Sequence, residues 1–193
     1  MMRQYSGVEE MNSGLERLLL KLEKAQKNNA PRTTNLGGFH TGTKLFNRDE
    51  PELRQLREII GDAILDFTDE FIQTNCTKPP DEMKMRIWGW GIVMRASDFN
   101  HQHVHPDAKI SGVYYVSVAG DGSKVADDNP EGSIMFADPR PRGRMNRIEN
   151  QITEVVIDPE PGKMILFPSY YEHAVFLFRC PGTRICIAFN ARF

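Results

Sequence analysis

The sequence predicts a mainly β fold preceded by two helices, with its strands arranged as a sandwich or a double-sheet jelly roll. In residues 1–75, apolar side chains recur at steps of three and four, which is typical of amphipathic helices. After Pro79-Pro80 the pattern changes to short β-branched and aromatic runs separated by Gly, Pro, Asn and Asp. Such runs indicate many strands joined by tight turns.

Two polar pairs mark where the helices are expected to begin. Ser6 with Glu9, and Asp49 with Glu52, have the spacing of a capping box. The apolar residues that follow are Val8, Met11, Leu15, Leu18 and Leu22 in the first helix and Leu53, Leu56, Ile60, Ile64, Phe67 and Phe71 in the second. Because each set lies on one face of its helix, we expect both faces to pack against a sheet.

The β region contains strand-forming runs at short intervals. We expect strands at Met85–Ala96, Ile110–Ala119, Gly132–Ala137, Ile152–Ile157, Lys163–Phe167, His173–Phe178 and Arg184–Asn190. This spacing favours a sandwich or a jelly roll over a parallel α/β sheet. The sequence shows no internal repeat, so we expect one domain over residues 1–193, with residues 1–75 as helical support and residues 80–193 as the jelly-roll core.

Composition limits the partners and the compartment. The 193 residues are 40% apolar and 26% charged, with a formal net charge of −2 at pH 7, which gives no strong nucleic-acid signal. The basic run Arg140, Arg142, Arg144 and Arg147 is expected to be a solvated loop. The sequence has no apolar signal core or membrane span, and its three cysteines indicate no disulfide framework. A cytoplasmic protein without membrane contact is therefore expected.

The clearest chemical signal is a histidine cluster in the segment 100–107. In an extended chain, His-x-His or His-x-Asp places two side chains on one side, because the side chains alternate between faces. Imidazole and carboxylate ligands suit iron(II) and leave open coordination positions. Two pairs remain open as the proximal ligands, namely His103 with His105, and His105 with Asp107.

A second signal lies further along the chain. His173 stands where a strand is expected to begin, and Arg184 follows eleven residues later within an apolar run. A buried unpaired charge costs several kcal/mol, so Arg184 needs an anionic partner. Its guanidinium fork matches the two oxygens of a carboxylate. The partner is either a dicarboxylic ligand or an acidic residue of this chain.

Several motifs occur in an order that resembles a known family. They are Gly38-Phe39-His40-Thr41, His103-Val104-His105-Pro106, Ser111-Gly112-Val113-Tyr114-Tyr115-Val116, Phe136-Ala137-Asp138-Pro139-Arg140, Pro161-Gly162-Lys163-Met164-Ile165-Leu166-Phe167-Pro168-Ser169, His173 and Arg184-Ile185-Cys186-Ile187-Ala188-Phe189-Asn190. From about residue 37 to the end of the sequence, the chain resembles the 2-oxoglutarate and iron(II) dependent oxygenases, and within them a small phage and bacterial group. The resemblance implies a double-stranded β-helix, a dioxygenase that uses Fe(II), 2-oxoglutarate and O2, and a hydroxylase reaction.

The resemblance also implies roles for individual residues. His173 would be the distal iron ligand, and Arg184 would hold the 5-carboxylate of 2-oxoglutarate. The superfamily has His-x-Asp or His-x-Glu as its proximal pair, so His105 would take the carboxylate position if His103 is the first ligand. Either Tyr114 or Tyr115 should point inward and offer its hydroxyl to 2-oxoglutarate.

Other features distinguish this chain from the family pattern or leave its chemistry open. Cys186 stands where many relatives have a serine, and a thiol is a weaker hydrogen-bond donor. Trp88 and Trp90 share a face and are expected to belong to the core. The segment from Phe99 to His105 is similar to prolyl hydroxylases, so a protein or peptide substrate is expected by analogy. The segments 120–130 and 140–151 have the composition of mobile lids.

Two other classes of protein fit parts of the pattern. A cupin-like metalloenzyme could use the His-x-His pair without 2-oxoglutarate, but it would have no need of a buried Arg184. A non-catalytic jelly-roll binding module would carry these histidines incidentally and would bind no iron.

Overall fold

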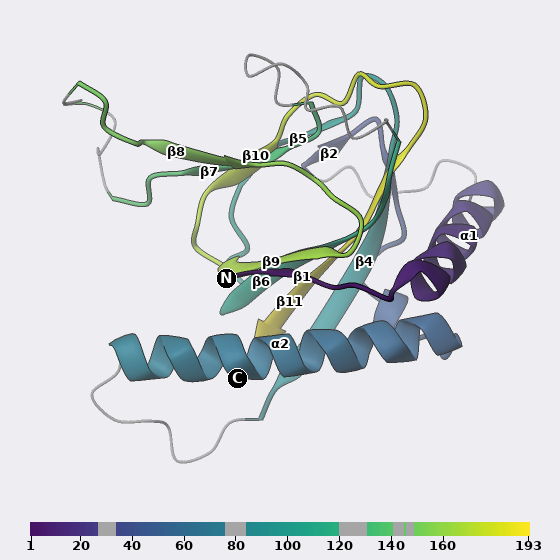
Figure 1. The fold of residues 1–193 in the computed structure, drawn as a ribbon, viewed down its shortest axis with the longest axis horizontal. Coiled ribbons are helices and arrows are strands. Elements are labelled where there is room, and N and C mark those ends of the chain that lie inside the picture. Colours follow the sequence, from purple (N-terminus) through teal and green to yellow (C-terminus); the bar gives the residue numbers. More distant parts are fainter. Residues whose placement is uncertain (27–33, 76–83, 120–130, 141–144, 146–148) are drawn as a thin grey trace.

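The computed structural model describes the chain except for residues 27–33, 76–83, 120–130, 141–144 and 146–148. Two antiparallel β-sheets face one another, and two helices lie outside one of them (Figure 1). This arrangement confirms the predicted mainly β jelly roll with N-terminal helices. No helix in the described part of the chain is long and apolar enough to cross a membrane.

The larger sheet has six strands and forms the floor of the molecule. In spatial order they are β1 (Met2–Gln4), β9 (Lys163–Pro168), β6 (Ile110–Val118), β11 (Arg184–Arg192), β4 (Arg86–Met94) and β3 (Phe39–His40). The three long strands β6, β11 and β4 lie side by side at its centre. They combine β-branched and aromatic residues with glycines where another element approaches closely.

The smaller sheet has five strands and covers the other side of the interior. In spatial order they are β2 (Asn35–Leu36), β5 (Phe99–His103), β10 (His173–Val175), β7 (Ile134–Ala137) and β8 (Glu154–Ile157). Strand β10 pairs with β5 on one side and with β7 on the other. Segments that are far apart in the sequence are therefore adjacent in this sheet.

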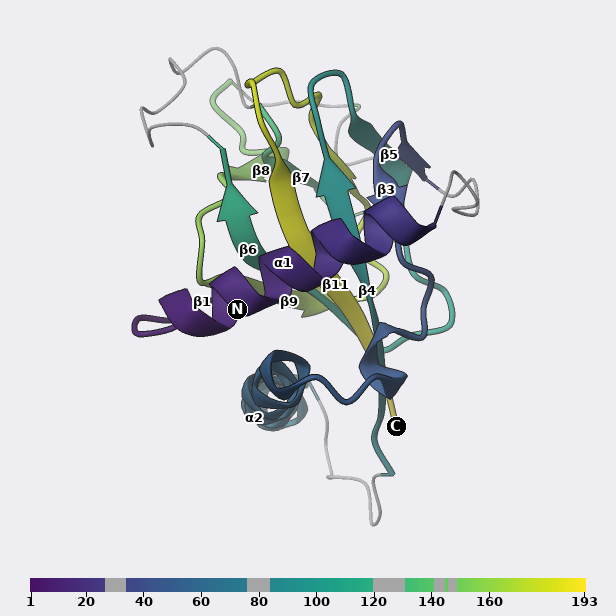
Figure 2. The same cartoon turned by 90° about the vertical axis from the view of Figure 1, so that its right-hand side faces the viewer.

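Helices α1 (Glu9–Ala25) and α2 (Pro51–Asn75) pack outside the six-stranded sheet, and a short 3₁₀ helix, η1 (Leu45–Asn47), precedes α2. Figure 2 shows α1 crossing β6, β11 and β4. The close approach depends on Gly91, since a Cβ there would lie 2.3 Å from Leu19 Cδ2. The predicted apolar faces therefore pack against a sheet, as expected.

The interior has two apolar clusters, one on each face of the six-stranded sheet. The first lies between this sheet and the helices and includes Leu15, Leu56 and Ile187. The second lies between the two sheets and includes Ile92 and Phe136. Burying each such side chain contributes about 1.5–3 kcal/mol, so the helices hold the six-stranded sheet firmly from behind.

The predicted helix starts are wrong by one or two residues. Helix α1 begins at Glu9, with Val8 at its N-cap and no side-chain cap hydrogen bond, so Ser6 makes no capping box. Helix α2 begins at Pro51, because proline suits the first helical position, where no N–H is needed. Asp49 instead accepts a hydrogen bond from Arg54.

All seven predicted strands are present, with bounds that differ by one to three residues at some ends. Strands β1, β2, β3 and β5 were not expected, because they are short or carry little apolar pattern. Three of them come from residues 1–75, so this region contributes strands as well as helical support. Most of the two expected lid segments, including Arg142, Arg144 and Arg147, lies outside the described residues.

Candidate active site

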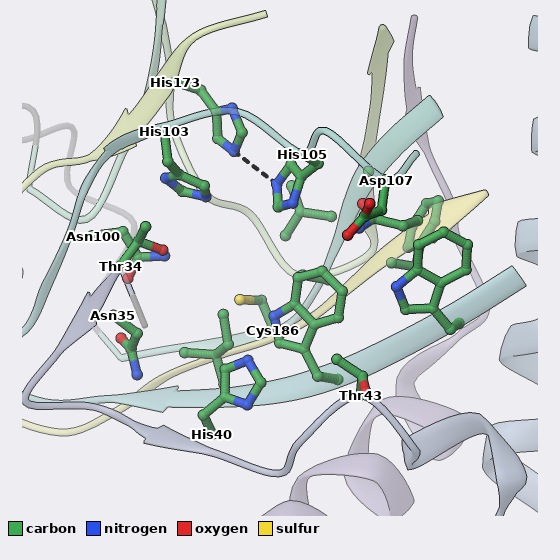
Figure 3. A pocket seen from close by; sticks show the side chains of 18 of the residues that line it. Thr34, Asn35, His40, Thr43, Asn100, His103, His105, Asp107, His173 and Cys186 are labelled. Atoms are coloured by element: carbon green, nitrogen blue, oxygen red, sulfur yellow. Dashed lines mark hydrogen bonds between the residues drawn. The ribbon is translucent and has the colours of Figure 1, made fainter. Parts of the chain in front are cut away.

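A cavity of about 890 Å³ lies between the two sheets and is lined by residues from both. Its size is within the range of cofactor and substrate sites. The floor consists of inward-facing residues of β4 and β11, and the opposite wall carries the histidines (Figure 3).

Three predicted histidines meet in this cavity. His103 ends β5, His105 lies two residues further on, and His173 begins β10. His103 and His173 are directly opposite in the antiparallel pair, and their ring centroids are 4.2 Å apart. One nitrogen of each of the three imidazoles lies within 4.8 Å of the others. The described residues thus provide three nitrogen ligands around one point.

Backbone carbonyls fix two of the rings in the orientation that a metal requires. His103 Nδ1 lies 2.7 Å from the carbonyl oxygen of His101, and His173 Nδ1 lies 2.9 Å from that of Tyr171. Each Nδ1–H donates to its carbonyl, so the Nε2 lone pair is directed away from it. The Nε2 atoms of His105 and His173 are 3.3 Å apart. This spacing allows one ion to contact both nitrogens.

Burial keeps the three imidazoles neutral. Desolvation lowers the pKa of His103, while desolvation and then the neighbouring His103 lower the pKa of His105 to about 4. Desolvation is also the main cause that lowers the pKa of His173 to about 3. A metal binds only the neutral form of histidine, so the rings are ready for an ion near neutral pH.

No carboxylate joins the three histidines among the described residues. Asp107 lines the same cavity but is exposed and lies beside His105, outside the three-histidine group (Figure 3). Of the two proximal pairs considered above, the geometry favours His103 with His105. A site of three imidazoles is chemically suited to iron(II), which accepts nitrogen ligands readily.

Arg184 is the largest fully buried side chain among the described residues and lines the cavity beyond the histidines. Its Nε donates to the carbonyl oxygen of Gly132 over 2.8 Å, and its Nη1 lies near Met94 Sδ at 3.3 Å and Cys186 Sγ at 3.4 Å. Sulfur accepts hydrogen bonds weakly. No salt bridge to Arg184 occurs among the described residues, so its guanidinium has no anionic partner there. Of the two partners considered from the sequence, an acidic residue of the described chain is therefore excluded.

The register of β6 decides which tyrosine points inward. The Tyr115 ring packs against Arg184, whose Cζ is 4.9 Å from the ring centroid. Its hydroxyl is buried and has no hydrogen-bond partner in the described part of the chain. Burial raises the pKa of Tyr115 to about 12, so the hydroxyl keeps its proton and can donate it. Tyr114 faces the other way and donates to Asn12 Oδ1 of α1 over 2.7 Å.

Trp88 and Trp90 belong to the core between the two sheets, as predicted, and both also line the cavity. Trp90 lies between two imidazoles, with its ring centroid 5.7 Å from that of His40 and 5.9 Å from that of His105. Sequence reasoning gave His40 no role. The motif Gly38-Phe39-His40-Thr41 could have indicated a role for His40, because it is one of the motifs that resemble the family. Only the pairing of β3 with β4, however, brings His40 to the cavity.

His40 presents one defined donor to the cavity. Its Nδ1 accepts a hydrogen bond from the backbone N–H of Gly42 over 2.9 Å. Burial lowers the pKa of His40 to about 4, so the neutral ring carries its proton on Nε2.

Residues 89–190, more than half of the chain, match the model of a family described as "Putative 2OG-Fe(II) oxygenase". The chain belongs to this 2OG-Fe(II) oxygenase family, and it is an oxidoreductase whose cofactors are iron(II) and 2-oxoglutarate, with O2 as oxidant. A comparison with curated proteins finds no match.

Solved structures with the same fold include several oxygenases. A Pseudomonas putida prolyl-4-hydroxylase has a TM-score of 0.63 at 13% identity, over 100% of this chain and 91% of that one. HygX from Streptomyces hygroscopicus with nickel, 2-oxoglutarate and hygromycin B bound has a TM-score of 0.65 at 11% identity, over 99% and 81%. A Trichoplax adhaerens prolyl hydroxylase in complex with a hypoxia inducible factor peptide fragment has a TM-score of 0.58 at 12% identity, over 99% and 82%.

Proposed function

We propose that the protein is a hydroxylase in which His103, His105 and His173 hold iron(II) and Arg184 holds the far carboxylate of 2-oxoglutarate. The observation that carries the proposal is the position of a buried, unpaired guanidinium in the same cavity as three neutral imidazoles. A ligand that chelates a metal at one end and carries a carboxylate at the other matches both groups. A cupin-like site that uses no 2-oxoglutarate would give Arg184 no partner.

The remaining groups orient the co-substrate. Tyr115, whose hydroxyl lacks a partner, donates to a carboxylate oxygen near Arg184. Cys186 occupies the space beside the guanidinium with a thiol whose pKa is raised by burial, so it stays neutral. The bound iron and 2-oxoglutarate supply the oxidising chemistry, and the protein supplies their orientation and an enclosed site.

A protein or peptide is the proposed primary substrate. The similarity of the segment from Phe99 to His105 to prolyl hydroxylases supports this class. Two of the structural neighbours named as prolyl hydroxylases, one of them bound to a peptide, give further support. The support is by analogy, since one fold can serve several substrates.

The test is an anaerobic titration of the apo-protein with iron(II) and then 2-oxoglutarate, followed by the weak visible charge-transfer band of their chelate. We expect a band in the wild type, no band in His173→Ala, and a band in Arg184→Ala that needs at least ~10-fold more 2-oxoglutarate. Arg17→Ala, an exposed change on α1, is the matched control. A folded wild type without the band would refute the proposal.

A further inference from the structure

The cavity has a second positive region at the end opposite Arg184. Three exposed cations line it, namely Lys44 before η1, Arg86 at the start of β4 and Arg192 at the end of β11. None of the three side chains forms a hydrogen bond or salt bridge within the described residues. Asp107 is the one acid that lines the cavity in the described part of the chain.

The sheet places two of these cations against each other. Arg86 and Arg192 are direct partners in the β4–β11 ladder, so their side chains leave the same face of the sheet. Like charges directly opposite one another destabilise a strand pair. An anion bound between the two guanidinium groups would remove this repulsion, and each guanidinium could donate two hydrogen bonds to a carboxylate.

The same ladder sets the distance from these cations to the histidines. Arg86, Trp88 and Trp90 alternate along the inner face of β4, and Trp90 packs under His105. Trp90 lies four positions along β4 from Arg86, which corresponds to roughly 13 Å at about 3.3 Å per residue. An extended peptide lying along β4 has a similar rise, so it would cover this distance with about four residues.

We propose that the primary substrate is an acidic peptide segment that carries an Asp or Glu about four residues from the residue to be oxidised. The proposal rests on the protein or peptide substrate class stated above. The acidic side chain binds between Arg86 and Arg192, with Lys44 beside them, and an intervening residue packs on the half-buried Trp88 ring. Arg184 is left to the co-substrate at the opposite end.

The chain carries a built-in reporter for this binding. Its two tryptophans, Trp88 and Trp90, both line the cavity, so intrinsic tryptophan fluorescence reports on this site alone. The probes are short Gly/Ser peptides with one central proline and a pair of Glu about four residues to either side of it. Matched peptides carry Gln or Lys at the same place, and all titrations are anaerobic with iron(II) and 2-oxoglutarate saturating.

We expect the Glu peptides to bind the wild type at least ~10-fold more tightly than the Gln or Lys peptides. The Arg86→Gln/Arg192→Gln variant should lose this preference, and Arg86→Glu/Arg192→Glu should reverse it towards Lys. Arg17→Gln should bind like the wild type. Removing two opposed cations should not lower the melting temperature, which excludes misfolding as the cause.

Three results would overturn the inference. The first is equal binding of the Glu, Gln and Lys peptides, and the second is a Glu preference that survives in the double variant. The third is a short oligothymidylate that binds more tightly than any peptide, which would assign the cations to a nucleic acid. The charge-transfer band is recorded in the same samples. If the wild type shows the band, each of these results refutes only the acidic-peptide proposal. If the wild type lacks the band, the proposed oxygenase site itself is refuted.

Discussion

Arg184→Met tests whether the buried guanidinium serves the co-substrate or the fold. Methionine fills a similar unbranched volume without charge, so packing is largely kept. In the apo-protein Arg184 is 1% exposed and lacks an acidic partner among the described residues. If the guanidinium serves to bind a ligand, its burial destabilises the ligand-free protein, because no anion offsets the loss of its hydration.

The magnitude follows from opposing contributions. Replacing a buried ionic group by a well-packed apolar one often stabilises a protein by about 1–4 kcal/mol. Against this, the variant loses the hydrogen bond to Gly132 and the contact with the Tyr115 ring, each of which contributes about 1 kcal/mol or somewhat more. We therefore expect the apo-variant to be as stable as the wild type, or more stable by about 1 kcal/mol.

The assay is urea unfolding of both apo-proteins, together with a 2-oxoglutarate titration in the presence of iron(II). A 2-oxoglutarate concentration that saturates the wild type should raise its free energy of unfolding, and should raise that of Arg184→Met much less, because a ligand stabilises a fold in proportion to how much of it is bound. A loss of more than about 2 kcal/mol in the apo-variant would show that Arg184 is a structural residue and would refute this reasoning.

Three further predictions separate neighbouring residues. Tyr115→Phe should weaken 2-oxoglutarate binding by roughly 10-fold at unchanged stability, whereas Tyr114→Phe should cost about 1 kcal/mol in urea unfolding, through its hydrogen bond to α1, and leave binding unchanged. Asp107→Asn should keep iron(II) binding within roughly 3-fold of the wild type, while His105→Ala should lose it, as measured by anaerobic iron titration. The apo-protein should lose stability as the pH falls from 6.5 towards 4, because burial lowers the pKa of His40 to about 4 in the folded state, so the unfolded chain binds the proton first. His40 contributes up to about 3 kcal/mol to this loss, so His40→Gln should reduce the slope of the curve measured by urea unfolding. The slope that remains comes from His103, His105 and His173, whose pKa values burial also lowers.

Each of these has a contrary outcome that can be observed. Equal effects of the two tyrosine changes on binding would mean that the register of β6 does not separate their roles. Loss of iron binding in Asp107→Asn would restore His105 with Asp107 as the proximal pair. A pH dependence that is the same in His40→Gln and the wild type would place the titrating groups elsewhere.

The sequence by itself determined the class of fold, and it singled out three histidines and an arginine that the structure places in one cavity. Period-three and period-four apolar patterns define the helices, and short β-branched runs define the strands, because these patterns reflect local geometry. The three histidines and Arg184 were identifiable because their chemistry is unusual in such surroundings. Local patterns could not identify β2, β3 or β5, whose few residues are held only by pairing with distant strands.

Only the tertiary structure decided how these residues meet. Strand register turns Tyr115 inward and Tyr114 towards α1, and a shift of one residue would exchange them. The pairing of β5 with β10 brings His103 opposite His173, and the ladder between β4 and β11 sets two arginines against each other at the far end of the cavity. These relations join residues far apart in sequence, so they depend on non-local hydrogen bonding that no local pattern specifies.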